Sequence, residues 1–264
     1  MNFKDQVVWI TGASSGIGRA LAIEFAKVGS ILILSSRNSE KLAAIKADCE
    51  NLGAQCFIQI LDLENQDNFA ELTDKMITKF EKIDILINNG GISQRSLAHE
   101  TPLEVDRKIM EINFFGNIAL TKTVLPYMLK KKSGHIVTIS SVAGKFGVPK
   151  RTTYSASKHA LQGFYESLRA EHKKDNINVH IAIPGYVKTN ISFNAVLSDG
   201  TMNNKLDDGQ AGGVSAEKCA QQILKGIKKN KKEILIGGKE LVMLHLRRFL
   251  PSVYHNIIDK VQTT

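Results

Sequence analysis

Tyr154 and Lys158 are a pair of residues whose types and spacing could support acid–base chemistry. Residues four apart lie on one face of a helix, so both side chains would face the same way. An ammonium nearby favours tyrosinate and lowers the tyrosine pKa, which makes tyrosine a useful acid and base near neutral pH. Ser140 and Ser141 end an apolar stretch just upstream, and a hydroxyl there could hydrogen-bond a carbonyl beside Tyr154. The Tyr–Lys spacing is common by chance, so the surrounding elements must support this interpretation.

A glycine-rich segment, Thr11-Gly12-Ala13-Ser14-Ser15-Gly16-Ile17-Gly18, lies between an expected strand and an expected helix. Gly12 permits a sharp turn, while Gly16 and Gly18 permit close approach of backbone to a pyrophosphate and of helix to sheet. The helix N-terminus adds amide donors for phosphates. A tight structural turn is the alternative, but the flanking strand and helix favour a dinucleotide site. Its expected contacts are Gly12, Ser14, Ser15, Gly16, Ile17 and Gly18.

The end of the second expected strand favours NADP(H) over NAD(H). An acidic residue there would bind the ribose 2′-hydroxyl of NAD, whereas this chain has Arg37, which can pair with a 2′-phosphate. The alternative is that Arg37 is an ordinary exposed residue at a helix start. Asp62 and Leu63, after the third expected strand, could flank the adenine.

Short β-rich stretches alternate with helical patterns along the whole chain. The expected strands are 7–11, 31–35, 55–61, 83–88, 135–140, 178–183 and 233–236. The expected helices lie near 16–28, 39–52, 66–81, 103–131, 152–174, 215–229 and 239–249. This alternation predicts one α/β domain, a doubly wound parallel sheet of the Rossmann type, over residues 1–264. It includes an irregular substrate loop at 190–213 and a C-terminal tail at 239–264.

These motifs, together with Asn88-Asn89-Gly90-Gly91 and Pro184-Gly185, occur in the order and at the spacing of a known family. The chain resembles the short-chain dehydrogenases/reductases over essentially its whole length. The resemblance implies carbonyl–alcohol interconversion by hydride transfer. It makes Asn113, Ser141, Tyr154 and Lys158 catalytic, with Ser141 preferred to Ser140. It adds cofactor contacts from Asn89, Gly90, Tyr154, Lys158, Pro184, Gly185, Val187 and Thr189.

The implied mechanism gives each catalytic residue a role. Tyr154 protonates the carbonyl oxygen and Ser141 orients it. Lys158 binds the nicotinamide ribose and lowers the pKa of Tyr154. Asn113 would fix a water that links Lys158 to solvent. The same four residues would serve a 3-oxoacyl thioester reductase, which is the alternative enzyme. A catalytically silent NADP-binding sensor is the other alternative, but it would be expected to lose Ser141, Tyr154 or Lys158.

Two segments, 88–101 and 154–171, resemble the "member 7" group of this family, whose members reduce steroids, retinoids and other apolar carbonyls. The residues expected to wall the pocket are mostly apolar, and a sugar or keto acid would need several fixed polar partners. They are Val142, Ala143, Phe146, Val148, Tyr186, Ile191, Phe193, Val196 and Leu197. We therefore expect a hydrophobic ketone or aldehyde as substrate. Gly200, Gly209, Gly212 and Gly213 suggest that the loop moves as a lid.

Composition restricts the partners. The formal charge is +9, but the lysine clusters lie near expected helix ends without interleaved aromatics, so we expect no nucleic-acid partner. Three cysteines without CxxC or metal-ligand spacing indicate a reducing compartment and no metal. The related group carries an N-terminal membrane anchor, whereas this chain starts at its first strand, so we expect a cytoplasmic protein. An apolar stripe (Ala156, Ala160, Leu161, Phe164 and Leu168) could pack on the sheet, but the resemblance implies that it joins subunits, so we expect a homodimer or homotetramer. The tail could cover the cleft, a subunit or, less favoured, a membrane surface.

Overall fold

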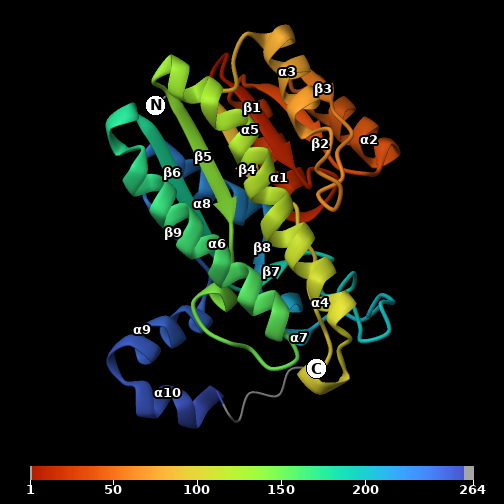
Figure 1. Ribbon diagram of the computed structural model, residues 1–264, viewed down its shortest axis with the longest axis vertical. Helices are drawn as coiled ribbons and strands as arrows, with labels where there is room; N and C mark the ends of the chain where they lie inside the picture. Colours follow the sequence, from red (N-terminus) through yellow and green to blue (C-terminus); the bar gives the residue numbers. More distant parts are fainter. Residues whose placement is uncertain (1, 259–264) are drawn as a thin grey trace.

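The computed structural model describes residues 2–258, which form a parallel sheet covered by helices on both faces (Figure 1). The sheet has seven strands in the order β3-β2-β1-β4-β5-β6-β9. Their bounds are β1 (Val7–Thr11), β2 (Ile31–Ser35), β3 (Cys56–Ile58), β4 (Ile85–Asn88), β5 (Gly134–Ile139), β6 (Ile177–Pro184) and β9 (Glu233–Ile236). Every neighbouring pair is parallel, which confirms the predicted doubly wound sheet.

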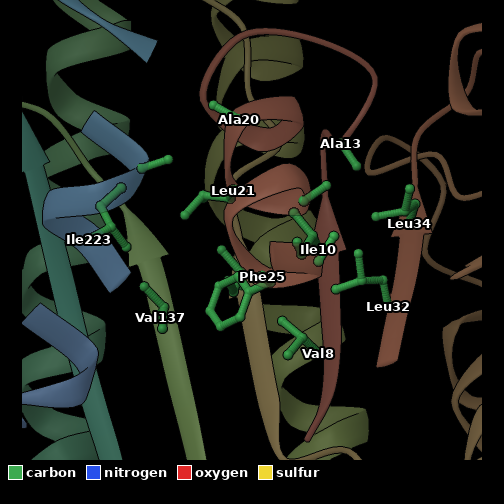
Figure 2. Close-up of a cluster of buried hydrophobic side chains, with 14 of the residues drawn as sticks. Val8, Ile10, Ala13, Ala20, Leu21, Phe25, Leu32, Leu34, Val137 and Ile223 are labelled. Carbon is green, nitrogen blue, oxygen red and sulfur yellow. The ribbon is translucent and has the colours of Figure 1, made fainter. Parts of the chain in front are cut away.

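The two faces of the sheet bury separate apolar clusters. One face is covered by α1 (Gly16–Lys27), α2 (Ser39–Asn51) and α8 (Ala216–Lys228), and the other by α3 (Phe69–Phe80), α5 (Gly116–Lys131) and α6 (Thr152–Glu171). Figure 2 shows the first cluster, where Val8 and Ile10 of β1 lie near Phe25 of α1. Val7 and Trp9 point to the opposite face. Burial on both faces is why these strands are continuously apolar in sequence.

The order in which successive strands are added to the sheet reverses between β1 and β4, and hydrogen bonds join the ends of these two strands. The Thr11 hydroxyl accepts from the amides of Asn89 and Gly90, each at 3.0 Å. The Asn89 side-chain amide donates to the carbonyls of Thr11 (3.0 Å) and Gly12 (3.2 Å). The glycine-rich loop and the Asn88–Gly91 segment are therefore brought together at the switch point of the sheet, where ligands bind in this class of fold.

The helix predicted over 103–131 is interrupted. It consists of α4 (Leu103–Met110), a π-helical turn at Glu111–Phe115, and α5. Asn113 lies in the π turn, where its side chain accepts from the Ile92 amide at 2.8 Å and donates to the Ile92 carbonyl at 2.9 Å. Such turns recur at functional sites. Other boundaries differ by a few residues; β3, for example, is shorter than the predicted 55–61.

The segment at 190–213 is irregular but firmly anchored. At its base, β7 (Val187–Lys188) pairs with β8 (Val214–Ser215), and the short helix α7 (Asp208–Ala211) follows its longest loop. A Cβ at Gly209 or Gly213 would lie 2.6 or 2.4 Å from atoms of Tyr186. These two glycines therefore permit close packing on Tyr186, which differs from the hinge role that the sequence suggested.

The tail forms a 3₁₀ turn (Lys239–Leu241), α9 (Val242–Phe249) and α10 (Pro251–Ile258), which extend beyond the carboxyl ends of the strands (Figure 1). Tyr254 packs edge-on against Phe146 with ring centroids 6.0 Å apart. The tail thus lies over the end of the sheet that carries the candidate site. The last part of the predicted tail, 259–264, is outside the described residues. Within residues 2–258, no helix is both long and apolar enough to cross a membrane.

A histidine pair, His180 buried and His135 half-buried, joins β5 to β6. The rings of His135 and His180 stack with centroids 5.3 Å apart, and His135 Nδ1 lies 3.0 Å from His180 Nε2. His180 Nδ1 lies 2.6 Å from the Lys231 carbonyl, which can only accept, so this nitrogen carries the proton. His180 Nε2 must then accept from His135. Burial lowers the pKa of both rings, that of His135 to about 4.

We predict that stability falls as the pH drops from about 6.5 towards about 4. The folded-state pKa of His135 is lower than its unfolded value, so the unfolded chain binds protons first and is favoured by acid. Protonation of His135 in the unfolded chain would alone lower the free energy of unfolding by about 2 kcal/mol between pH 7.5 and pH 5. Urea unfolding of the wild type and of His135→Gln, each at pH 7.5 and pH 5, measures this loss of stability. The variant should show a smaller loss, while His99→Gln, at an exposed ring, should behave as wild type. An unchanged loss in His135→Gln would contradict the assignment.

Candidate active site

A cavity of about 690 Å³ lies at the carboxyl ends of the strands. Apart from Gly18 and Asn113, every site residue expected from the sequence lines it, although these residues come from distant parts of the chain. They are Gly12, Ser14, Ser15, Gly16, Ile17, Arg37, Asp62, Leu63, Asn89, Gly90, Ser141, Tyr154, Lys158, Pro184, Gly185, Val187 and Thr189. The structure therefore brings the expected dinucleotide site and the expected catalytic residues into one cavity.

The glycines of the first loop occupy positions that larger residues could not. Gly12 and Gly16 have φ of +61° and +53°. A Cβ on Gly18 would lie 2.2 Å from the Gly12 carbonyl oxygen, so this glycine permits the close contact of α1 with the loop. A Cβ on Gly90 would lie 2.4 Å from Leu63 Cδ1. This cradle of backbone atoms at the N-terminus of α1 fits a dinucleotide pyrophosphate.

One end of the cavity is basic. The Arg37 side chain is 62% exposed and its Nη1 lies 4.0 Å from Asp62, a weak ion pair. Lys41, one turn into α2, lines the cavity beside Arg37 and was not expected from the sequence. Asn38 caps the N-terminus of α2 by accepting from the Lys41 amide at 2.8 Å. Two cations at a helix N-terminus suit a phosphate group.

Tyr154, Ser141 and Lys158 meet at the other end of the cavity. Ser141 follows β5 and hydrogen-bonds the Tyr154 side chain. Lys158 lies one turn after Tyr154 on α6, with its Nζ 5.8 Å from the Tyr154 ring centroid. Nζ donates to the Ile139 carbonyl at 2.9 Å, which fixes the long side chain. The hydroxyl of Ser140 points elsewhere: it donates to the Lys158 carbonyl at 3.0 Å and accepts from Gln162 at 2.9 Å.

The pKa of Tyr154 differs from the sequence expectation. Burial raises this pKa, whereas the sequence predicts that Lys158 lowers it. The hydrogen bond from Ser141 and the charges of Arg151 and Arg95 act in the opposite direction. Burial also lowers the pKa of Lys158 to about 8. The site therefore holds a protonated phenol beside an amine that can change its protonation state near neutral pH.

Asn113 does not line the cavity, yet it touches residues that do. Its amide nitrogen donates to Ser157 at 3.1 Å as well as to Ile92, and its backbone carbonyl accepts from Asn117 at 2.8 Å. Gly91 lies between Asn113 and Lys158: a Cβ on Gly91 would lie 3.0 Å from Asn113 Oδ1 and 3.6 Å from Lys158 Nζ. Asn113 thus supports the wall next to Lys158.

Besides Lys41, the charged residues Arg95, Lys108, Arg151 and Glu240 also line the cavity and were not expected from the sequence. Arg95 and Arg151, whose charges act on Tyr154, both bind Asp207. Glu240, from the turn after β9, accepts from the Tyr186 amide at 3.0 Å, and a Cβ on Gly185 would lie 2.0 Å from it. Local sequence carried no signal for Glu240 because β9 and β6 meet only in the folded sheet.

Comparison with known proteins gives the family. Residues 6–198 match the family model "short chain dehydrogenase". The chain belongs to the short-chain dehydrogenase family. A Drosophila melanogaster relative, "Dehydrogenase/reductase SDR family protein 7-like", is 42% identical over 260 residues, 97% of this chain and 80% of the relative. This confirms the resemblance to the member 7 group.

Two solved structures of short-chain dehydrogenases have the same fold. One, from Burkholderia phymatum in complex with NAD, superposes with a TM-score of 0.86 at 24% identity and covers 96% of each chain. A metagenomic short-chain oxidoreductase in complex with NADP gives a TM-score of 0.75 at 24% identity, over 89% of this chain and 98% of that chain. Both likenesses concern the fold.

We predict that Gly18→Ala destabilises the protein and weakens dinucleotide binding. Its Cβ would meet backbone, which cannot move aside without displacing the loop, so we expect a loss of about 1–3 kcal/mol in the free energy of unfolding. Gly163→Ala is the matched control, because Gly163 is also helical and a Cβ there has no neighbour within 4 Å. That control should gain about 0.5–1 kcal/mol. Urea unfolding and NADPH fluorescence titration measure both effects; equal behaviour of the two variants would refute the packing argument.

Proposed function

We propose that this protein is an NADP(H)-dependent oxidoreductase that interconverts a hydrophobic ketone or aldehyde and its alcohol. The observation that supports this most is the single cavity that holds the glycine cradle, Arg37 and Lys41 at one end and Ser141, Tyr154 and Lys158 at the other. A catalytically silent sensor would not need the second group. The cavity volume of about 690 Å³ is large enough for both a cofactor end and a small apolar substrate.

The residues of the chain suit reduction of a carbonyl. Bound NADPH would supply the hydride. The Tyr154 hydroxyl, kept protonated by burial, donates its proton to the carbonyl oxygen. Ser141, which already hydrogen-bonds Tyr154, orients that oxygen. Lys158 would bind the nicotinamide ribose of the bound cofactor, and its lowered pKa, about 8, favours proton exchange with solvent near neutral pH.

The walls around Tyr154 support an apolar substrate. Seven of the nine residues expected to wall the pocket do line the cavity: Val142, Ala143, Phe146, Val148, Tyr186, Ile191 and Val196. Phe193 and Leu197 do not. The structure adds Met202 from the loop and Met243 from the tail. Arg95, Arg151 and Glu240 are charged exceptions, but Asp207 pairs with both arginines and the Tyr186 amide donates to Glu240, which engages all three within the protein.

The expected oligomer remains a proposal. The apolar stripe on α6 divides in the structure: Leu161 and Leu168 are buried in the chain's own core, whereas Ala156 is exposed and Ala160 and Phe164 are half-buried. We propose that the accessible part of this stripe, with exposed Phe115 before α5, forms the contact between copies. A cytoplasmic location and the absence of a nucleic-acid partner likewise remain proposals.

We predict that Tyr154→Phe lowers turnover by roughly 10²–10⁴-fold while NADPH binding stays nearly intact, because only the hydroxyl transfers a proton. Tyr127→Phe, which removes a surface hydroxyl bonded to Asp74, is the control and should remain active. NADPH consumption should be followed with steroids, retinal, medium-chain carbonyls and a 3-oxoacyl thioester, against sugars and 2-keto acids. Full activity in Tyr154→Phe would overturn the catalytic assignment, and a preference for the polar set or the thioester would overturn the substrate class.

We predict that the protein prefers NADPH to NADH by roughly tenfold or more, because a charge-assisted pair with the 2′-phosphate contributes about 1.5–3 kcal/mol. Arg37→Asp should reverse the preference, and Lys41→Ala should reduce it. Lys46→Ala is a control, since Lys46 lies on the same helix but pairs with Glu50 outside the cavity. Dissociation constants from fluorescence titration decide the matter; equal affinities for the two cofactors in the wild type would contradict it.

A further inference from the structure

The segment Ser93-Gln94-Arg95-Ser96 after β4 is polar and buried, and catalysis as described above does not use it. Gln94 is 0% and Arg95 6% exposed. Burial of such groups is costly unless they are hydrogen-bonded, so their partners show what the segment holds in place.

Gln94 fixes the start of the catalytic helix. Its side-chain oxygen accepts from the amides of Thr153 (2.9 Å) and Tyr154 (3.3 Å), which have no partner within α6. The backbone on either side binds the substrate loop: the Val196 amide donates to the Ser93 carbonyl at 2.9 Å, and the Arg95 amide donates to the Val196 carbonyl at 2.9 Å. One short segment therefore contacts both the backbone of Tyr154 and the loop.

Charged side chains make a second connection between the same parts. Asp207 of the loop accepts from Arg95 Nε at 3.1 Å and from its Nη2, and from Arg151 Nη2 at 2.6 Å. Arg95 also donates to Ser93 at 2.9 Å and to the Gln94 carbonyl at 2.5 Å. Arg151 stands at the N-terminal end of α6, three residues before Tyr154. Asp207 thus draws together one arginine from each side of the catalytic tyrosine.

The cluster carries a net positive charge next to Tyr154. Two guanidinium groups face one carboxylate, which leaves one charge uncompensated, and the buried Arg151 Nε has no hydrogen-bond partner among the described residues. Arg95, Arg151 and Tyr154 line the same cavity. A positive charge in a poorly hydrated site favours an anion nearby, here the tyrosinate that forms when the proton leaves.

We propose that Arg95, Arg151 and Asp207 are positioning residues that couple docking of the substrate loop to the ionisation of Tyr154. This proposal rests on the proposed function, in which Tyr154 is the proton donor. With the loop docked, Asp207 holds both arginines beside the phenol, so the site becomes ready for proton transfer when the substrate is covered. The two arginine charges oppose the effect of burial on the Tyr154 pKa.

Other charged groups lie on the elements packed around Tyr154. Lys158 lies on the same helix; Asp106 of α4 accepts from the Thr153 hydroxyl; Glu240 approaches through the Tyr186 amide. Among the described residues, the ion-pair partners of Asp207 are Arg95 and Arg151. Changes at Asp207 and Arg151 therefore alter the cluster while leaving these groups in place.

The test is the titration of Tyr154 by phenolate absorbance, obtained as the difference between each protein and the same protein with Tyr154→Phe. Arg151→Gln removes a positive charge and should raise the midpoint by about one pH unit, and Arg151→Lys should restore it. Asp207→Asn weakens the hold on both arginines and should raise the midpoint as well. The double variant should shift the midpoint no further than the larger single change, because both changes act through the same cluster. Glu166→Gln, the same type of change farther along α6, should leave the midpoint unchanged.

Additive shifts in the double variant, failure of Arg151→Lys to restore the midpoint, or no shift in either single variant would overturn the proposal. The pH profile of kcat with the best carbonyl substrate should move in the same directions as the titration. Because the absorbance titration needs no turnover, it tests the charge cluster independently of the proposed function. Failure of all carbonyl substrates would refute the function while the titration would still report on the cluster.

Discussion

The hydrogen bonds between the ends of β1 and β4 are the constraint on which the rest of the site depends. Thr11 and Asn89 join the two strands where the order of the sheet reverses. This join sets the glycine-rich loop against the Asn88–Gly91 segment so closely that a Cβ on Gly12 would lie 2.8 Å from the Gly90 Cα. Only glycine permits such an approach of two backbones. The cofactor cradle and the wall next to Lys158 both continue from this point.

Helix α6 connects the ends of these strands to the catalytic residues. Its N-terminus is capped by Gln94, which follows β4, and its side chains reach back to the end of β5 through Lys158 and Ile139. Tyr154 is therefore held by contacts to two neighbouring strands and not by its own helix alone. The π turn around Asn113 adds a third support through Ile92 and Ser157. Burial at the meeting point of these elements raises the pKa of the phenol.

Much of the fold and of the candidate site could be predicted because the signals are local. Continuously apolar strands, the glycines of the first loop and the spacing of Tyr154 and Lys158 each depend on a few adjacent residues. The π turn could not be predicted, because helical periodicity continues through Asn113 and does not show one residue of extra length. The pairing of Arg95 with Asp207 spans 112 positions, so no sequence spacing indicated it.

The pKa of Tyr154 shows why local spacing was insufficient for the chemistry. The sequence placed an ammonium one turn away and predicted a lowered pKa, but the folded site commits the Lys158 ammonium to the Ile139 carbonyl. Desolvation then dominates, since removing water disfavours tyrosinate more than a cation 5.8 Å from the ring favours it. For reduction this is an advantage, because a phenol that keeps its proton is a competent donor. The charges that oppose the effect of burial on this pKa come instead from Arg95 and Arg151, and Asp207 of the substrate loop pairs with both.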